Sequence, residues 1–408
     1  MSSMTSASAG ALLRQGSFLF FLASRSLSRL SSLVGIVAMG WQVYDLTGSA
    51  FALGMIGLVG FLPTAILVFV AGHTVDRYER KRIMQACQLA EALTTAFLAW
   101  GAFSGWLTVI HIFVATLVLG TTAAFENPAT AALLPLITPQ GSLQRATAMS
   151  SGAAQVATIA GPALGGLAYA VSPAMAYAIM VLFWLLAALF AGAIQLTQPA
   201  APKDDTATPG DLFAGVRFIR QSPPILGTLS LDLFAVLFGG VTALLPIYAR
   251  DILVTGPMGL GILRASPAVG ALFMTTMLAR HPIHRRVGLR MFQAVIVFGV
   301  ATIVFALSKL MWLSALSLAV LGAADTISVV IRFSLVQLST PNEMRGRVGA
   351  VNFLFINASN NLGQFESGIT AALFGTMPAA VLGGVATVAV ALLWMKLFPT
   401  LRDVDKLE

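Results

Sequence analysis

The sequence predicts an all-α membrane protein whose helices cross the bilayer twelve times. The prediction rests on the apolar composition, on twelve apolar runs of helical length, and on the placement of the cations between them. Of the 408 residues, 57% are hydrophobic and 10% are charged, and the mean hydropathy is +0.87. A water-soluble protein of this composition could not cover its surface with polar groups, so we expect lipid to be its main solvent.

Each of the twelve runs is long enough to span a bilayer as a helix. We predict spans over residues 17–45, 51–72, 83–104, 107–135, 146–170, 174–196, 224–249, 259–279, 289–308, 311–338, 348–374 and 379–398. A polar break separates six spans from six. It predicts an N-terminal six-helix bundle over 1–197, a cytoplasmic linker over 198–222 and a C-terminal six-helix bundle over 223–408.

The cations predict the orientation of these spans. If the N-terminus is cytoplasmic, 18 of the 24 Lys and Arg residues lie in cytoplasmic segments, 2 lie in outer loops and 4 lie inside spans. Cytoplasmic loops of membrane proteins carry such an excess, so we expect both termini in the cytoplasm. The pI near 10.1 then reflects topology, and nucleic acid is not an expected partner.

Sequence signals for enzymes and cofactors are missing. There is no Gly-x-x-x-x-Gly-Lys-Ser/Thr phosphate loop, so ATP is not the direct energy source. The four histidines lack metal-ligand spacing, and Cys87 is the only cysteine. We therefore expect no enzymatic activity, no metal and no cofactor. The prediction is a monomeric transporter whose partners are a small-molecule substrate, protons and membrane lipid.

The two halves of the chain repeat each other. Six residues recur 202 positions later, from Leu136, Thr138, Pro139, Arg145, Gly161 and Gly166 to Leu338, Thr340, Pro341, Arg347, Gly363 and Gly368. Such a repeat predicts two pseudo-symmetric bundles, related by an axis along the membrane normal, with a substrate site between them.

Ionisable residues inside spans indicate function, because each costs about 2.5–3.5 kcal/mol at the centre of an inserting helix. Arg25, Arg29 and Ser32 lie on one face of the first span, where two cations suit an anionic substrate or an acidic partner. The alternative is that both arginines extend toward the headgroups. Asp232 lies 207 residues after Arg25, so the repeat predicts that the two face each other or share a ligand. Asp232 is then either a proton carrier or half of a fixed pair.

The tenth and eleventh spans are also polar. Asp325, Ser328 and Arg332 share a face of the tenth, and the Asp and the Arg lie two turns apart. Each is therefore expected to reach a neighbouring helix, for a substrate or simply as polar glue between helices. In the eleventh span, Asn357 and Asn361 lie on one face and are further candidates for substrate binding.

Carboxylates in these spans are candidate proton carriers. Glu126 lies toward the inner half of the fourth span and Glu366 in the outer half of the eleventh, and Asp232 and Asp325 join them. An unpaired carboxylate in such surroundings favours its neutral form. Glu91 in the third span is assigned instead to packing or to the lipid edge.

The densest cluster of ions lies between the second and third spans, in Gly72-His-Thr-Val-Asp76-Arg77-Tyr-Glu-Arg80-Lys-Arg82. It resembles the loop 2–3 motif of the major facilitator superfamily, with Glu79 where that family usually has Gly. The resemblance implies a cytoplasmic gate. In it, Asp76 faces the N-terminus of the eleventh span, near 343–347, when the cytoplasmic side is closed, and Arg77 is placed to pair with Glu343.

A second motif, Gly161-Pro162-x-x-Gly165-Gly166, lies in the fifth span. It resembles the end of the motif on the fifth helix of antiporters in the same superfamily. Its upstream glycines are replaced here by Ala148 and Ala157. The alternative is a packing seam without meaning for the direction of transport.

The strings over residues 43–49, 323–332 and 344–368 narrow the resemblance. With the loop motif, they resemble the branch of bacterial exporters that includes the enterobactin exporter, the transmembrane secretion effectors. The resemblance covers about residues 17–395. It implies export of a small molecule, such as an anionic siderophore, across the bacterial inner membrane by proton antiport. The alternatives are a multidrug or lysolipid exporter, a proton-coupled importer and a non-transporting membrane receptor.

Overall fold

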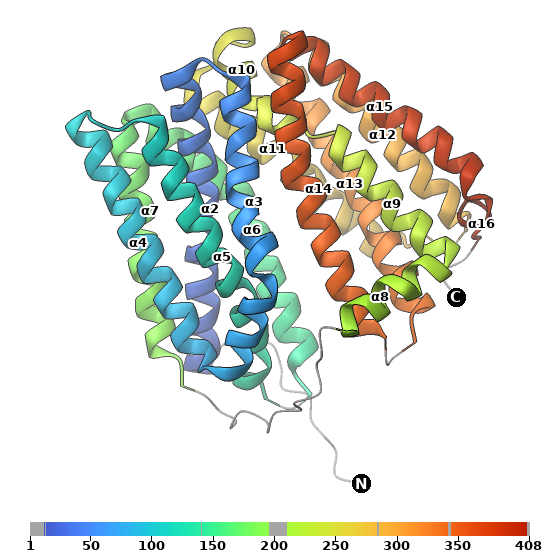
Figure 1. The fold of residues 1–408 in the computed structure, drawn as a ribbon, viewed down its shortest axis with the longest axis horizontal. Coiled ribbons are helices and arrows are strands. Elements are labelled where there is room, and N and C mark those ends of the chain that lie inside the picture. The colour runs from blue at the N-terminus through green and yellow to red at the C-terminus, as the bar shows by residue number, and fades with distance from the viewer. Residues whose placement is uncertain are drawn as a thin grey trace. The chain divides into compact units, whose positions relative to one another are not determined.

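The computed structural model describes residues 12, 14–139, 141–195, 210–283, 285–341 and 344–405. Within these residues every regular element is a helix (Figure 1). The first half contains α2 (Gly16–Thr47), α3 (Ala50–Arg77), α4 (Arg80–Ser104), α5 (Val109–Ile137), α6 (Leu143–Val171) and α7 (Pro173–Ala193). The second half contains α8 (Gly210–Gln221), α9 (Pro223–Phe238), α11 (Gly256–Arg280), α12 (Val287–Leu307), α13 (Met311–Ser339), α14 (Arg345–Phe374), α15 (Thr376–Leu397) and α16 (Pro399–Arg402).

A helix lies at each of the twelve positions predicted to span the membrane. In the described part of the chain, 10 of them are long and apolar enough to cross a bilayer. The remaining two positions are α4 and α14. Helix α4 begins with three cations, Arg80 to Arg82, and α14 carries the asparagines of the eleventh predicted span, so both are more polar than the others.

The seventh position is not one continuous α-helix. Helix α9 ends at Phe238 and is followed by Gly239 and Gly240, a 3-10 turn η1 (Val241–Leu244), the short α10 (Leu245–Ile247) and a π-helical turn η2 (Tyr248–Ile252). A Cβ added to Gly240 would lie 2.5 Å from the Gly363 carbonyl oxygen. The break therefore occurs where the chain passes directly against the backbone of α14.

The predicted linker is partly helical. Helix α8 occupies most of the second half of 198–222 and packs on α14 and α9 (Figure 1). Ile219 is buried against Ile225 and Val348, whereas Arg217 and Arg220 are exposed. The short helix is therefore amphipathic, and its apolar face belongs to the second half of the protein.

The helices form two compact units. The first unit comprises the described residues of Met1–Thr47 and Val59–Lys203, and the second comprises those of Gly48–Leu58 and Asp204–Glu408. The start of α3 thus belongs to the second unit, and the predicted boundaries of the two bundles remain a prediction. Each unit has its own apolar core, around Phe21 and Leu133 in the first and around Phe292 and Ile331 in the second.

The sequence repeat corresponds to a repeated helix contact. In the first unit, a Cβ on Gly161 of α6 would lie 2.6 Å from Leu33 Cβ, and one on Gly165 would lie 3.0 Å from the Val34 backbone. In the second unit, a Cβ on Gly363 of α14 would likewise lie 2.8 Å from the Val236 carbonyl oxygen of α9. Helices α6 and α14 therefore use equivalent glycines to approach α2 and α9.

The C-terminal segment closes the start of α12. The Gly288 N–H donates to the Val404 carbonyl (3.0 Å), and the Val287 N–H donates to the Asp405 carbonyl (3.3 Å). The Arg286 N–H donates to Asp405 Oδ1 (3.0 Å). These N–H groups begin a helix and have no intrahelical acceptor, so the C-terminal segment supplies their partners.

Candidate functional site

Glu126 is the centre of a polar cluster inside the first unit. Glu126 is 8% exposed, and its Oε1 accepts hydrogen bonds from Gln88 Nε2 of α4 (2.9 Å) and Ser28 Oγ of α2 (3.0 Å). Gln88 Nε2 also donates to Ser24 Oγ (3.1 Å). Ser24 and Ser28 are four residues apart on α2 and therefore share a face. Three helices thus direct polar side chains to one buried point.

Glu91 lies in the same region and was missed by the sequence analysis. The expectation that it lies at the lipid edge is wrong, because the residue is only 2% exposed. Its Oε1 lies 2.7 Å from Thr122 Oγ1 of α5, and its Oε2 has no hydrogen-bond partner among the described residues. The spacing contained the signal: Glu91 follows Gln88 by three residues, and Thr122 precedes Glu126 by four, so each pair shares a helix face.

The two arginines of α2 are in different situations. Arg25 Nη1 donates to Ser150 Oγ of α6 (2.7 Å), and Arg25 also attracts Glu126 electrostatically. Arg29 is exposed and is repelled by Arg25. Ser32 Oγ donates to the Ser28 carbonyl of its own helix (3.0 Å). Of the two arginines, Arg29 is therefore the one whose side chain is exposed on this face.

In the second unit, Asp232 of α9 forms a buried salt bridge with Arg332 of α13. The side chains are 10% and 4% exposed, respectively. Arg332 thus reaches a neighbouring helix. Each of Arg25 and Asp232 has a partner inside its own unit. That the two residues face each other or share a ligand remains a prediction.

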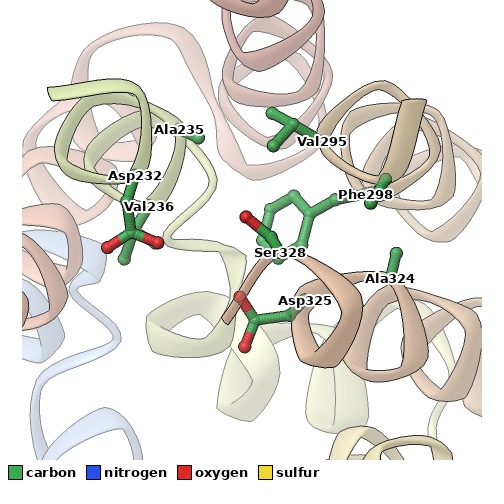
Figure 2. A pocket seen from close by; sticks show the side chains of 9 residues that line it. Asp232, Ala235, Val236, Val295, Phe298, Ala324, Asp325 and Ser328 are labelled. Carbon is green, nitrogen blue, oxygen red and sulfur yellow. The ribbon is translucent and has the colours of Figure 1, made fainter. Parts of the chain in front are cut away.

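A small pocket lies beside this salt bridge (Figure 2). Its polar groups are Asp232, Asp325 and Ser328, which Figure 2 shows around a common space. Its apolar lining is Ala235, Val236, Ala294, Val295, Phe298 and Ala324. Arg332 balances the charge of Asp232, whereas Asp325 has no cationic partner among the described residues. The pocket is therefore apolar with one uncompensated carboxylate.

Two of the candidate polar residues of α14, Asn361 and Glu366, bond within their own helix. Asn361 Nδ2 donates to the Asn357 carbonyl (2.8 Å), and Glu366 Oε1 accepts from Thr370 Oγ1 (2.7 Å). Glu366 is half-buried. These contacts assign neither substrate nor proton binding to the helix.

The charged loop forms a tight turn between α3 and α4. Arg82 Nε pairs with Glu79 Oε2 (2.6 Å), and Arg80 Nη1 donates to the Ala132 carbonyl of α5 (3.5 Å). Asp76 and Arg77 are exposed at the end of α3. Glu343, the predicted partner of Arg77, lies outside the described residues. No side chain of the described chain crowds Gly72, since a Cβ there would meet nothing within 4 Å.

The motif of the fifth span lies in the middle of α6, which continues through Pro162 as one helix. Gly161, Pro162, Gly165 and Gly166 are all buried, and the first and third form the close contact with α2. These contacts are what the alternative interpretation of the motif, a packing seam between helices, leads one to expect. A role of the motif in gating remains a prediction.

Among the described residues, no group of three or more His, Cys, Asp or Glu side chains is arranged to hold a metal ion. The polar groups that the fold brings together are therefore the Glu126 cluster, the Asp232–Arg332 pair and the pocket beside it. Such groups can bind and release protons or a charged small molecule.

Comparisons with known proteins agree with this architecture. The macrolide efflux protein A of Streptococcus pyogenes is 24% identical over 397 residues, which cover 95% of this chain and 96% of that protein. The multidrug efflux pump Tap of Mycolicibacterium fortuitum is 25% identical over 421 residues, covering 96% and 98%. The crystal structure of the nucleoside transporter NupG (D323A mutant) has a TM-score of 0.75 at 15% identity, covering 93% of this chain and 99% of its own.

The last comparison concerns the fold alone, which is that of the major facilitator transporters. A family model described as transmembrane secretion effector matches residues 7–408. The chain therefore belongs to the transmembrane secretion effector family and is a multi-pass transporter of the major facilitator type, not an enzyme.

Proposed function

We propose that this protein exports an apolar small molecule carrying a positively charged group, by alternating access and proton antiport. In this proposal, all twelve helices span the bacterial inner membrane, both termini are cytoplasmic and the transporter is a monomer. Export is supported by the relatives, whose names describe efflux of macrolides and of multiple drugs. The cation distribution supports the orientation.

The uncompensated carboxylate of Asp325 carries the proposal for the substrate. An apolar pocket with one unpaired acid suits a cationic end group attached to an apolar body, because the charge pair and the apolar contacts form together. The pocket is small, so we assign to it only the cationic end of the substrate. Asp232 lines the same pocket, but Arg332 balances its charge, so Asp232 adds little attraction for a cationic substrate.

Proton antiport is supported by the buried acids that lack a bonded cation. Glu126 is held by an amide and a hydroxyl, and Asp325 has no cationic partner in the described chain. The sequence contains no phosphate loop, so it does not indicate ATP as an alternative energy source for transport. In the proposed cycle, a carboxylate takes up a proton from outside as the cation leaves. Asp76, Arg77, Arg80 and Arg82 remain the proposed gate at the cytoplasmic end.

The test is efflux of the fluorescent cation ethidium from drug-hypersensitive bacteria that express the full chain. We expect the wild type to accelerate efflux and Asp325→Asn to weaken it. A hydrogen bond to a charged group contributes about 1.5–3 kcal/mol, which corresponds to roughly a 10- to 100-fold weaker apparent affinity. Asp403→Asn, at an exposed acid of the C-terminal end, is the matched control. Equal efflux by both variants would contradict the role of Asp325.

A second candidate, export of an anionic siderophore, is favoured by the open guanidinium of Arg29 beside Arg25. The test is mass spectrometry of medium and cells of the native host under iron limitation, with and without this gene. An iron chelator lost from the medium and retained in the cells would favour this candidate, and Arg29→Gln should then reproduce the loss. Unchanged chelator levels would remove it.

A further inference from the structure

The polar cluster of the first unit contains two acids, Glu91 and Glu126, inside a helical core. They are 2% and 8% exposed, and each repels the negative charge of the other. The charged groups that face them are few. Helix α2 brings Arg25, α4 brings Cys87 one turn before Glu91, and α7 has no charged side chain. Within the described part of the chain, one cation, Arg25, therefore faces two buried carboxyl groups.

The hydrogen bonds distinguish the two acids. Glu126 Oε1 accepts from both Gln88 Nε2 and Ser28 Oγ, and Arg25 adds an attractive charge. Two donors on one oxygen and a nearby cation are the surroundings of an ionised carboxylate, which can only accept. Among the described residues, the attraction of Arg25 therefore acts on Glu126, and Glu91 has no bonded cation.

Glu91 has the opposite surroundings. Thr122 Oγ1 lies 2.7 Å from Glu91 Oε1 and 2.9 Å from the Leu119 carbonyl oxygen. A hydroxyl has one hydrogen, so Thr122 cannot donate to both oxygens. If Glu91 is protonated, its O–H donates to Thr122 and Thr122 donates to the Leu119 carbonyl, so a neutral acid accounts for both contacts of the hydroxyl. If Glu91 is ionised, Thr122 donates to its Oε1, but Oε2 has no donor and the buried charge has no bonded cation among the described residues.

We propose that Glu91 and Glu126 hold one proton between them and that Glu91 carries it, which makes Glu91 the proton-binding residue of the first unit. Its role in transport rests on the proposed function, whereas its protonation does not. The Glu126 cluster then provides a fixed negative charge that keeps the proton from leaving until the surroundings of Arg25 change.

The test is infrared spectroscopy of the purified full-length protein at neutral pH, as difference spectra between the wild type and single variants. A protonated carboxyl group has its own C=O stretching band, which shifts in D2O. We expect this band to lose intensity in Glu91→Gln and to persist in Glu126→Gln. Thr122→Val, which removes the acceptor of the Glu91 O–H, should shift the band without removing it.

Three outcomes would overturn the assignment. The first is a band that is lost in Glu126→Gln and retained in Glu91→Gln, and the second is the same intensity in all variants. The third is loss of the wild-type band on adding NaCl at constant pH, since this would identify a sodium site.

Thermal unfolding provides a second measurement, in which Glu91→Gln, a neutral mimic of the protonated acid, should unfold no earlier than the wild type. Glu126→Gln leaves Arg25 without its acid and should unfold earlier.

Transport is tested separately, with ethidium in proteoliposomes under an imposed pH gradient. We expect the gradient to accelerate ethidium transport by the wild type and to have no effect on Glu91→Gln, which should retain ethidium exchange at zero gradient. If the gradient still drives Glu91→Gln, Glu91 does not couple protons to transport. Failure of the wild type to move ethidium would contradict the proposed function alone, because the infrared assignment needs no substrate.

Discussion

The two units hold their buried acids in different ways. In the second unit, Asp232 is bonded directly to the guanidinium of Arg332 across α9 and α13. In the first unit, Glu126 is bonded to an amide and a hydroxyl, while Arg25 directs its hydrogen bond to Ser150. A direct ion pair must break before either group changes charge. The acids of the first unit can gain or lose a proton without breaking one, so the second unit is suited to a fixed contact and the first to titration.

This difference exists on a shared frame. The glycine contacts of α6 on α2 and of α14 on α9 are equivalent, and they lie at the positions where the sequence repeats. The packing of the two units is therefore alike in this respect, whereas the polar residues placed on it are not. The following predictions test that distinction, from the largest expected effect to the smallest.

Removing one partner of the Asp232–Arg332 pair should have the largest effect. Arg332→Gln leaves a buried aspartate without a cation, which typically costs about 3–5 kcal/mol of unfolding free energy. The double variant Asp232→Asn with Arg332→Gln should recover most of this loss. The measurement is thermal unfolding of the purified protein in detergent. If the double variant were as unstable as the single one, the pair would not be the cause.

Filling the glycine seam should have the next largest effect. A side chain at Gly165 would meet the Val34 backbone at 3.0 Å, so Gly165→Val should cost about 1–3 kcal/mol through overpacking. Gly152→Val on the same helix is the matched control, because a Cβ there meets nothing within 4 Å. The two unfolding temperatures give the answer. Equal values would mean that α6 and α2 can separate without loss.

Arg25→Gln should cost less than Arg332→Gln. Arg25 is half-buried, and its bonded partner is the neutral Ser150, so we expect a loss of about 1 kcal/mol. The same unfolding assay compares the two arginines directly. If Arg25→Gln were the more damaging variant, the contrast between the two units would be wrong, and Arg25 would hold Glu126 as tightly as Arg332 holds Asp232.

The exposed pair of Glu79 and Arg82 should matter least. Their side chains are 40% and 82% exposed and three residues apart on a helix start, so their attraction is screened by water. Glu79→Gln should change the unfolding free energy by no more than about 0.5 kcal/mol, and less at high salt. A larger loss that persists in 1 M salt would indicate that Glu79 has a further partner.

The sequence predicted the positions of the long helices well, because long apolar runs impose helices in lipid. It did not predict the break after Phe238, since Gly239 and Gly240 require it only through their contact with α14. It also treated 198–222 as a linker, although Ile219 and its neighbours give α8 an apolar face.

The candidate site could be predicted only in part. Single ionisable residues in apolar runs are visible in a sequence, so Glu126, Asp232, Asp325 and Arg332 were found. Which of them pair depends on how neighbouring helices are rotated, and a single sequence does not contain that rotation. The burial of Glu91 shows the difficulty, because its partner Thr122 comes from another helix 31 residues later.

The capping of α12 by Val404 and Asp405 has a practical consequence. A reporter or purification tag fused closely behind these residues would compete with them for the space next to the backbone amides of Val287 and Gly288. Fusions at the N-terminus avoid this conflict. For the assays described above, we therefore expect N-terminally tagged protein to give the higher yield of folded transporter, and a flexible spacer to restore the yield of C-terminal fusions.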